Sequence, residues 1–559
     1  MKNISNPIYF LLLSCFLLTQ CKKKEVYQEP NVPPVALQMT SISINQVNPL
    51  PGATTTNVVL QPNIKLRFSN ALDRATVAGA VTIKENSLTP VALNISYENS
   101  DSTLVLVPVA PLKYLTSYLL AATRDLKSIK GGALDVAKNY SFNTRIDSSY
   151  KFPVISDSAL LDLVQQQTFK YFWDFGHPIS GMARERNTSG ETVTTGGTGF
   201  GVMAIPVAIS RNFITRDQGL ARMQLLVGFL KNTAQRFHGA YPHWMNGSTG
   251  IVQPFSQKDD GADLVETSYL MQGLVCVKEY FNQTTTAETN LRNDIGSILD
   301  AVEWDWFTRG GQNVLYWHWS PNYGWDMNVS IRGWNECLIT YVMAASSTTH
   351  PIARAVYDNG FAQNGGIRNN NAYYGYVLPL GPTLGGPLFF SHYSFLGINP
   401  HGLSDAYANY WTQNENHSRI NYSYSVSNPM NYFGYSNSCW GLTACDVMNG
   451  YDACSPTNDL GVIAPTAALS AMSYTPDESM RALRFYYYIL GNKLWGEYGF
   501  YDAFSLQKNW FASSALAIDQ GPVIVMIENY RSGLLWNLFT GNAAIKNGMR
   551  TFGFTAPYL

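Results

Sequence analysis

The sequence contains few charged residues. They make up 14% of its 559 positions, against about 25% in a typical soluble domain. The 38 Lys and Arg residues nearly balance the 39 Asp and Glu residues, and the formal net charge is −1. A chain without an excess of either sign has no field that would attract nucleic acid or an acidic surface. We therefore expect no nucleic-acid partner.

Cysteine is also scarce. Of seven cysteines, Cys15 and Cys21 lie near the N-terminus, and the others are Cys276, Cys337, Cys439, Cys445 and Cys454. This odd and scattered set does not form a disulfide scaffold, and the lack of a C-x-x-C pair argues against a zinc site. Cys439, Cys445 and Cys454 are close enough in sequence for one bridge in an oxidising compartment. The sequence leaves that bridge open.

Motifs of several enzyme classes are missing. The nucleophile motif G-x-S-x-G is absent, because Ser248 has Asn246 where the first glycine belongs. The glycine-rich TGGTGFG at 195–201 lacks the full dinucleotide fingerprint and precedes no βαβ pattern. None of the eight histidines belongs to an H-E-x-x-H pair, the usual mark of a zinc hydrolase. We therefore expect neither a metal nor an organic cofactor.

The N-terminal apolar run is too short for a membrane-spanning helix. It extends from about Ile8 to Leu18, whereas a spanning helix needs roughly 20 residues. Residues 1–21 are therefore expected to be a signal peptide. Leu18-Thr19-Gln20-Cys21 resembles a lipoprotein cleavage box, so we expect a lipid on Cys21, with residues 22–37 as a tether to the membrane of the cell envelope. A plain secretory signal with an incidental cysteine is the alternative.

Aromatic residues are abundant. The chain has 34 Tyr, 27 Phe and 13 Trp, which together make 13% of its residues. Aromatic rings pack large cores and stack on the C–H faces of sugar rings. A neutral, aromatic-rich chain is therefore suited to an uncharged partner such as a sugar.

Residues 38–147 show the alternation of β-strands. Apolar and polar residues alternate in IKLRF (64–68), TLVLVP (103–108) and YLLA (118–121), with turn signals at Pro51-Gly52 and Gly131-Gly132. Short alternating strands separated by turns are typical of a β-sandwich. The runs LRFSNALD, STLVLVPVAPL and TSYLLAATRDL resemble bacterial Ig-like domains, which are usually spacers. Sugar binding is the alternative role.

Residues 148–559 have a helical pattern instead. Apolar residues recur at i, i+3 and i+4 in ALLDLVQQQTFKYFWDF, which begins after a cap at Asp157 or Ser158. Helical stretches follow near 198–211, 215–236, 262–281, 285–308, 333–347, 403–415, 464–473, 476–492, 520–531 and 533–546. Several are apolar nearly all round, which indicates buried helices. A double-layered α/α barrel accounts for this pattern, and a plain array of helices is the alternative.

Carboxylates concentrate in KDDGADLVETSYLMQGL at 258–274. Asp259, Asp263 and Glu266 are spaced i, i+4 and i+7, which would place them on one face of a helix. Acidic residues are favoured at helix N-termini. That explains Asp259 or Asp260, but it explains Glu266, a turn further in, poorly. We therefore favour a functional role for the cluster.

Two more acids are expected at junctions between a loop and a helix. Glu336 is predicted in the first turn of an apolar helix, beside a Trp-rich loop at 316–334. Asp519 precedes Gln520-Gly521-Pro522, which predicts a helix start with proline in its first turn. A tryptophan core in the first case and a simple N-cap in the second are the conservative interpretations.

Seven segments, in order, resemble one known family. They are GGTGFGVMAI, DDGADLVETSYLMQGLV, RGWNECLITYVMAASS, CWGLTACD, IAPTAALSAM, ALRFYYYILGNKLWGEYGFYDAF and AIDQGPVIVMIENYRSGLLW. Together they are similar to the glucoamylase-like domain of bacterial β-1,2-glucanases, glycoside hydrolase family 144, from about Leu160 to Thr555. The segment VMNGYDACS departs from the family pattern, so a different cleft shape is expected near 446–455.

The resemblance implies an (α/α)6 barrel that hydrolyses β-1,2-linked glucose with inversion and without a metal. In such a reaction one carboxylic acid protonates the leaving oxygen, while a carboxylate activates water. Glu336 matches the family position of the acid. For the base, Asp519, Asp263 and Glu266 stay open, with Asp259 in the same cluster. The expected sugar contacts are Arg184, Arg186, Tyr269, Trp317, Trp319, Trp325, Arg332 and His392.

The expected activity is therefore endo-acting hydrolysis of β-1,2-glucan to sophorose and short oligosaccharides, by a monomer at the cell envelope. An exo-acting enzyme that releases sophorose from chain ends is one alternative. A glycan-binding lipoprotein without catalysis is another. A polysaccharide lyase is disfavoured, because the sequence carries no sign of an acidic substrate.

Overall fold

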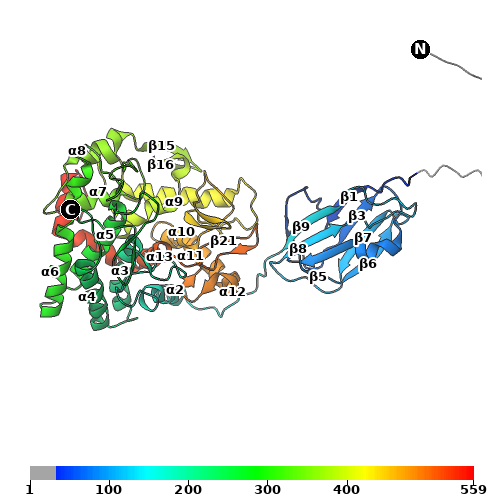
Figure 1. The fold of residues 1–559 in the computed structure, drawn as a ribbon, viewed down its shortest axis with the longest axis horizontal. Coiled ribbons are helices and arrows are strands. Elements are labelled where there is room, and N and C mark those ends of the chain that lie inside the picture. The colour runs from blue at the N-terminus through cyan, green and yellow to red at the C-terminus, as the bar shows by residue number, and fades with distance from the viewer. Residues whose placement is uncertain (1–32) are drawn as a thin grey trace, which may run out of the picture.

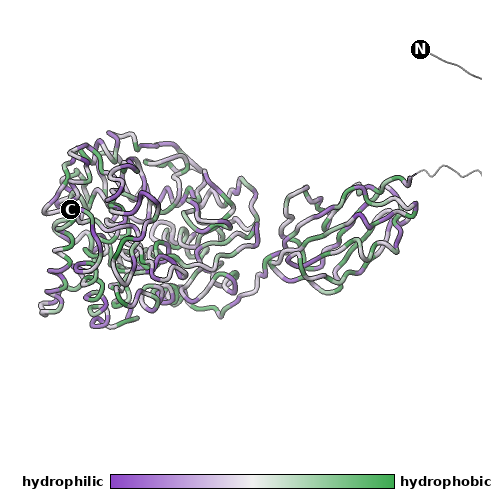
Figure 2. Tube along the Cα trace, viewed as in Figure 1, coloured by the Kyte–Doolittle hydropathy of each residue, from purple (hydrophilic) through white to green (hydrophobic). Residues whose placement is uncertain are grey.

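The computed structural model describes residues 33–559. The predicted signal peptide, Cys21 and most of the tether lie outside the described residues. Two domains follow one another, a β-sandwich and a helical domain, and residues 145–156 join them (Figure 1). Hydrophobic and hydrophilic positions are interspersed along the described trace of both (Figure 2). No helix in this part of the chain has the length and hydropathy needed to cross a membrane.

The first domain is a sandwich of two sheets, with strand orders β1-β3-β7-β6 and β2-β9-β8-β4-β5. Its strands are β1 (Met39–Ile44), β2 (Thr55–Val58), β3 (Ile64–Phe68), β4 (Val81–Glu85), β5 (Thr89–Pro90), β6 (Leu93–Glu98), β7 (Thr103–Pro108), β8 (Ser117–Ala122) and β9 (Lys138–Thr144). Alternation buries one face of each sheet: in β3, Ile64, Leu66 and Phe68 are buried between the sheets. The predicted Ig-like sandwich is confirmed.

The inner layer of the second domain is a ring of buried helices. It consists of α3 (Thr195–Ser210), α5 (Leu264–Tyr280), α7 (Leu338–Ser346), the short helices η6 (Leu388–Ser391) and η7 (Tyr393–Leu396), α10 (Pro465–Ser470) and α13 (Ala517–Ser532). α3 packs on α5, α5 packs on α7, and α7 packs on η7. η7 and α10 both pack on α13, and α13 closes the ring by packing on α3. All nine residues of α7 are buried, which explains why such segments are apolar all round.

The outer layer surrounds this ring with helices that are only partly buried. They are α2 (Asp157–Trp173), α4 (Arg216–Asn232), α6 (Thr286–Asp300), α8 (Arg354–Val356), α9 (Tyr410–Ser427) and α11 (Pro476–Arg484), followed by α14 (Leu534–Gly541) and α15 (Ala543–Thr551). In α6, Leu291, Ile295 and Ile298 form the buried stripe, and most of the other face meets solvent. The expected α/α barrel is confirmed.

One predicted helix start is wrong at the acidic cluster. α5 begins at Leu264, so Asp263 is its N-cap, and Asp259 and Asp260 precede the helix. The reason is local: Ala262 and Asp263 form the short strand β13 (Ala262–Asp263), which pairs with β14 (His318–Trp319). The placement of Asp259, Asp263 and Glu266 on one helical face is therefore wrong.

Three other helix boundaries also differ from the prediction. α7 begins at Leu338, so Glu336 lies in the turn before the helix and not in its first turn. α13 begins at Ala517 with Leu516 as N-cap, so Asp519 is not a cap but lies within the first turn. The stretch predicted at 403–415 is instead α9, which starts after Asn409, because that side chain accepts a hydrogen bond from the backbone N–H of Thr412.

The cysteines in the described residues are all free and buried. The bridge that the sequence left open among Cys439, Cys445 and Cys454 is not formed in this structure. These three side chains lie instead within one hydrophobic cluster of the barrel, where a thiol packs as a small apolar group.

Candidate active site

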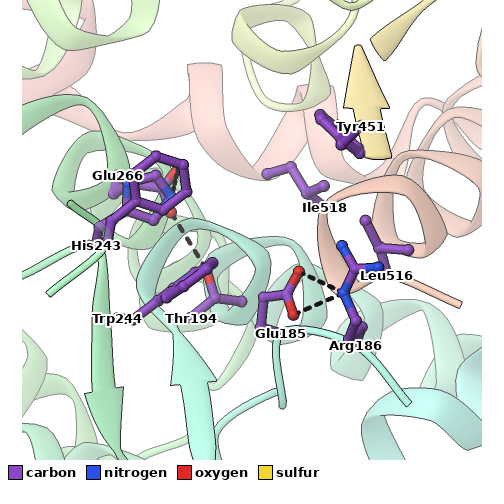
Figure 3. Close-up of a pocket in the computed structure, with 10 residues that line it drawn as sticks. Glu185, Arg186, Thr194, His243, Trp244, Glu266, Tyr451, Leu516 and Ile518 are labelled. Atoms are coloured by element: carbon purple, nitrogen blue, oxygen red, sulfur yellow. Dashed lines mark hydrogen bonds and ion pairs between the residues drawn. The ribbon is translucent and has the colours of Figure 1, made fainter. Parts of the chain in front are cut away.

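A cavity of about 390 Å³ lies at the N-terminal ends of the inner helices α3, α5 and α13. Its lining residues are Glu185, Arg186, Thr194, His243, Trp244, Phe255, Glu266, Tyr451, Leu516 and Ile518 (Figure 3). A second hollow of about 600 Å³, bounded by Asp446 and residues 510–514, shares Arg186 and Tyr451 with the first. The two hollows are therefore neighbouring parts of one groove.

Glu266 is a carboxyl group in the cavity wall. Its Oε2 accepts a hydrogen bond of 2.7 Å from the backbone N–H of Gly196 and one of 3.4 Å from the Thr194 hydroxyl (Figure 3). Burial raises the pKa of Glu266 to about 7. A Cβ atom on Gly196 would lie only 2.5 Å from Oε2. One function of the glycine-rich TGGTGFG is thus to leave room for this carboxylate.

Glu336, the predicted acid, lies in the turn before α7 and lines neither hollow. Its backbone carbonyl accepts a 2.5 Å hydrogen bond from the Ser394 hydroxyl, which holds the turn against η7. The side chain stays partly exposed. Burial of the carboxyl group raises the pKa of Glu336 to about 7, and the nearby Glu266 and Asp263 add to the rise. A carboxyl group with a pKa near 7 is suited to donate a proton at neutral pH.

Two buried tyrosines lie near the carboxyl groups. The rings of Tyr269 and Tyr393 meet edge to face with centroids 5.7 Å apart. Burial raises the pKa of Tyr269, with Glu336 the strongest charged neighbour, and burial raises the pKa of Tyr393, with Asp519 first and Glu336 next. Glu336 and Asp519, which lie far apart in sequence, therefore both approach the phenol of Tyr393.

Asp519 has a buried partner, Asp502, that the sequence analysis missed. Each is 3% exposed, and the Asp502 Oδ2 accepts a 2.6 Å hydrogen bond from the backbone N–H of Asp446. Burial raises the pKa of Asp502 to about 7, and burial together with the adjacent Asp502 raises the pKa of Asp519. Asp502 lies in GFYDAF, a segment that contributed to the family resemblance, but it follows a short strand and no periodic signal marks it.

Arg186 lies on the opposite side of the cavity from His243 and Glu266 (Figure 3). Its Nε is 3.0 Å from Glu185 Oε2, and its Nη1 is 3.3 Å from Asp446 Oδ1. The side chain keeps 31% of its surface exposed. A guanidinium fixed by two carboxylates and open to both hollows is placed to bind sugar hydroxyls.

Tyr451 projects from a hairpin into the groove. The hairpin consists of β17 (Ala444–Val447) and β18 (Gly450–Ala453), and Tyr451 is 46% exposed. This is the segment that departs from the family pattern, and it lines both hollows. The sequence of this segment predicts a different cleft shape, but no pattern in it marks the tyrosine.

Most of the other expected sugar contacts do not line either hollow. They are Arg184, Tyr269, Trp317, Trp319, Trp325, Arg332 and His392. Arg184 donates to the backbone carbonyls of Gly190 and Phe175, and Trp319 and Trp325 pack against Trp306. His392 is 2% exposed, and burial lowers its pKa to about 3. Trp244, Phe255 and Tyr451 are aromatic residues that line the cavity instead.

Asp263 and Asp259 lie behind the cavity wall. Asp263 has no exposed surface, and its Oδ1 caps α5 by accepting the backbone N–H groups of Val265 and Glu266 at 3.0 and 2.9 Å. Asp259 is 4% exposed. Neither lines the cavity, so of the acidic cluster only Glu266 does.

The fold and groove define a class: an (α/α) barrel with carboxyl groups around an aromatic-lined groove, the arrangement that glycoside hydrolases require. A family model described as "Putative glucoamylase" matches residues 328–543, and the bacterial Ig-like domain model matches residues 38–144. The chain belongs to the family of bacterial β-1,2-glucanases, glycoside hydrolase family 144, as its similarity to solved members shows.

Two solved relatives and one curated relative illustrate the similarity. The endo-β-1,2-glucanase of Chitinophaga pinensis, solved with sophorotriose and glucose, is 50% identical, with a TM-score of 0.71 over 73% of this chain and 100% of its own. The β-1,2-glucanase of Parabacteroides distasonis is 35% identical, with a TM-score of 0.70 over 94% of this chain and 74% of its own.

The curated relative is an exo β-1,2-glucooligosaccharide sophorohydrolase (non-reducing end), also of Parabacteroides distasonis. It is 43% identical over 441 residues, which are 75% of this chain and 61% of the relative. The chain thus spans about three fifths of that protein's length. The relatives' names include both endo and exo action, so membership of the family does not choose between them.

Proposed function

We propose that this protein hydrolyses β-1,2-linked glucan. The observation that carries the proposal is a group of acids at one end of the barrel: Glu266 lines the cavity, and Glu336, whose pKa burial raises to about 7, has Glu266 as its strongest charged neighbour. Further carboxyl groups, Glu266 and the Asp502–Asp519 pair, lie near Tyr393, which Glu336 also approaches. The activities named for the relatives from Chitinophaga pinensis and Parabacteroides distasonis support this substrate.

Glu336 acts as the general acid in this proposal. It donates its proton to the glycosidic oxygen as the bond from that oxygen to the anomeric carbon breaks. A water molecule forms the new bond to the anomeric carbon from the opposite face, and a carboxylate accepts the proton of that water. The product therefore has the inverted configuration. Arg186 binds hydroxyl groups, and Trp244 and Tyr451 pack against sugar rings.

Two carboxyl groups compete for the role of base. Glu266 lines the cavity, whereas the oxygens of Asp519 are enclosed and lie beside Asp502. The variants Glu266→Gln and Asp519→Asn distinguish the two candidates. The variant that lacks the base should lose catalytic activity by about 10²-fold or more, whereas the other should mainly bind glucan more weakly. Glu415→Gln, on the outer helix α9, is the matched control. Comparable mild losses in both variants would assign neither as base.

We propose endo action, because the groove continues beyond the first cavity into the second hollow past Arg186 and Tyr451. A chain could then bind on both sides of the scissile bond. The time course of products from a long β-1,2-glucan tests this. Endo cleavage gives mixed long oligosaccharides early, while an exo-acting enzyme gives sophorose from the first minutes.

The activity itself is tested by the release of reducing ends from a panel of α- and β-glucans of different linkage. We expect release from β-1,2-glucan, and loss by about 10²-fold or more in Glu336→Gln. A non-catalytic glycan-binding protein would release none in either form and would bind glucan equally in both. Near-full hydrolysis by Glu336→Gln would rule out its role as acid.

We also propose that the protein is a lipoprotein of the cell envelope, anchored through Cys21. The proposal is supported by the short apolar run before Leu18-Thr19-Gln20-Cys21. Metabolic labelling with a fatty-acid analogue should mark the wild type and not Cys21→Ala, which should leave the membrane fraction. Labelling of both would contradict it.

A further inference from the structure

His243 lies between the acids behind the cavity wall and the acid in the wall. Its Nδ1 is 3.2 Å from Asp263 Oδ2 and 3.6 Å from Asp259 Oδ2. Its Nε2 is 4.0 Å from Glu266 Oε1, and Figure 3 shows the two side chains next to each other. The ring lines the cavity, and 23% of the side chain is exposed. One imidazole thus connects the two buried aspartates with Glu266.

The backbone places His243 beside the segment that binds the other oxygen of Glu266. The His243 carbonyl accepts the backbone N–H of Thr195 at 3.0 Å. The residues on either side of Thr195, which are Thr194 and Gly196, donate hydrogen bonds to Glu266 Oε2. Glu266 is therefore held at Oε2 by neutral donors, while its Oε1 faces the imidazole.

Two aromatic rings fix the plane of the imidazole. The His243 ring stacks on Phe255, with centroids 4.2 Å apart and planes 9° from parallel. Trp244 meets it edge to face, with centroids 5.7 Å apart. This packing restricts rotation of the ring, so Nδ1 stays directed to the aspartates and Nε2 to Glu266.

The ring is charged in this setting. His243 Nδ1 and Asp263 Oδ2 are buried atoms without a hydrogen-bond partner among the described residues, and a buried carboxylate is normally paired with an opposite charge. Burial alone would lower the pKa of His243, but the three acids, Glu266 first and then Asp259 and Asp263, raise it well above its ordinary value. Asp263 likewise raises the pKa of His318 against the effect of burial. Two imidazolium rings thus balance the two buried aspartates.

We propose that His243 is a positioning residue whose imidazolium holds Glu266 as the carboxylate that accepts the proton of the attacking water. Asp259 and Asp263 anchor this imidazolium from behind. The inference rests on the proposed function, in which Glu266 and Asp519 compete as base. A base has to be ionised before it can accept a proton. A nearby cation favours the ionised form of a carboxyl group, whereas a second carboxyl group disfavours it.

The two candidate bases have neighbours of opposite effect. Burial raises the pKa of Glu266 to about 7, and His243 limits that rise. Burial also raises the pKa of Asp519, but its neighbour Asp502 raises it further. The surroundings of Glu266 therefore favour a base near neutral pH, and those of Asp519 do not.

Removal of the imidazolium should act on Glu266 directly. Among residues 33–559, the oppositely charged partners within 4.0 Å of the ring nitrogens are three carboxylates, and Glu266 is the one on the Nε2 side. Without the cation its pKa should rise, so that Glu266 would be ionised only at higher pH. The titratable and charged groups that face His243 are Asp259 and Asp263 before α5, Glu266 on α5, His318 on β14 and, across the cavity, Glu185 and Arg186.

The test compares the titration of Glu266 in the wild type and in His243→Gln, without substrate. In a chain labelled with δ-¹³C glutamate, the Glu266 signal is the one that is absent from Glu266→Gln. We expect its midpoint to rise by about 1 pH unit or more in His243→Gln. His350→Gln, which alters a surface imidazole 3.0 Å from Asp305, is the control and should leave the midpoint unchanged.

The pH profile of activity gives a second readout. The acidic limb of kcat/KM on β-1,2-glucan should move up with the Glu266 midpoint, so His243→Gln should lose about 10-fold more activity at pH 6 than at alkaline pH. A purely structural role of His243 would lower activity equally at every pH, and that result would overturn the proposal.

An unchanged Glu266 midpoint in folded His243→Gln would also overturn it. If that variant does not fold, ¹⁵N signals of the histidine rings in the wild type decide, with His243 recognised by its contact with the Phe255 ring. We expect an imidazolium at pH 7, and a neutral ring there would contradict the proposal. Absence of reducing-end release by the wild type would refute the proposed hydrolysis, while the titrations would still show whether His243 sets the charge of Glu266.

Discussion

Glu336 illustrates how one residue's surroundings set its chemistry. In water its carboxyl group would be ionised at neutral pH. Here the surrounding protein raises its pKa to about 7, with Glu266 and Asp263 adding to the rise. A substantial fraction of Glu336 is therefore protonated at neutral pH, where the proposed reaction requires it to donate a proton. The same environment has consequences for activity and for stability.

The activity should decline as pH rises through about 7, because Glu336 then loses the proton that it donates. The measurement is kcat/KM on β-1,2-glucan across the neutral range. Glu336→Asp, which keeps a carboxyl group but moves it, should lower kcat and shift the alkaline limb. A profile that stays flat well above pH 7 would contradict the assignment of Glu336 as acid.

The raised pKa of Glu336 should also make the stability of the fold depend on pH. The pKa of Glu336 rises from 4.5 to about 7 on folding. The folded state therefore holds a proton that the unfolded chain has released, and this contribution to the free energy of unfolding decreases between these two pH values. Glu336→Gln removes that loss. We expect the thermal midpoint of the variant, measured relative to that of the wild type, to rise as the pH is raised from acidic to alkaline. If calorimetry shows the same difference between the two midpoints at every pH, this prediction is wrong.

The acidic residues of the site could be predicted from the sequence, but their burial and their neighbours could not. Glu336, Glu266 and Asp519 were all predicted as site residues, and all three approach Tyr393. Asp502 was missed because a single acid after a short strand has no periodic signal. Burial also depends on neighbours distant in sequence, so no local pattern could show that Asp263 is fully buried and does not line the cavity.

At the scale of elements, α3 and α5 approach so closely that their backbones touch at glycines. A Cβ atom on Gly199 would lie 2.3 Å from the Tyr269 carbonyl oxygen, and one on Gly273 would lie 2.3 Å from the Gly199 carbonyl oxygen. Only glycine allows this contact. The close approach brings Gly196, on α3, against Glu266, on α5.

Gly196→Ala should therefore impair catalysis more than folding. The new methyl group would displace Glu266 Oε2 and the Tyr269 ring, which lie 2.5 and 2.8 Å from its position. We expect kcat/KM on β-1,2-glucan to fall by about 10-fold or more. Gly228→Ala is the control: it has open space around it in α4, so it should keep activity and gain up to about 1 kcal/mol of stability. Equal activity of both variants would contradict the role of Gly196.

The inner helices could be predicted because they are apolar all round, whereas the turns that carry the site could not. The prediction placed Glu336 inside a helix, since the segment from 333 to 347 reads as one apolar unit. Gly333 has a φ of +80°, and the chain turns there before α7 begins at Leu338. Similarly, α9 is rich in Asn, Ser and Tyr, so its helical character comes from packing and a cap, not from an apolar stripe.

At the scale of the whole molecule, the sandwich docks on a loop and on the short helix α12 (Gly491–Leu494) of the barrel domain. Asn143 Nδ2 donates to the Gln507 carbonyl at 3.1 Å, and Lys493 Nζ donates to the Leu115 carbonyl at 3.3 Å. Leu115 itself is buried in a hydrophobic cluster of the barrel although its φ is +43°. A leucine in this backbone region is strained, and its burial offsets the strain.

Leu115→Ala should loosen this docking without changing the cavity. Truncating a buried leucine costs about 2–5 kcal/mol, and here the loss falls on the junction between the domains. We expect faster proteolysis within residues 145–156 and unchanged hydrolysis of short β-1,2-glucooligosaccharides. Leu88→Ala, at a position 79% exposed in the sandwich, is the control. Equal proteolysis of the two variants would show that Leu115 does not hold the domains together.

The buried thiols can be used to measure local opening of the folded chain, because a reagent reaches them only when the structure around them opens. Burial raises the pKa of Cys276, Cys337 and Cys439, so their thiolate forms are rare and reagents cannot reach them. An alkylating reagent can label each one only while its surroundings are open. Because Cys337 follows Glu336 while Cys276 lies within α5, labelling followed by peptide mapping would time the opening of the catalytic turn separately from that of the inner helix.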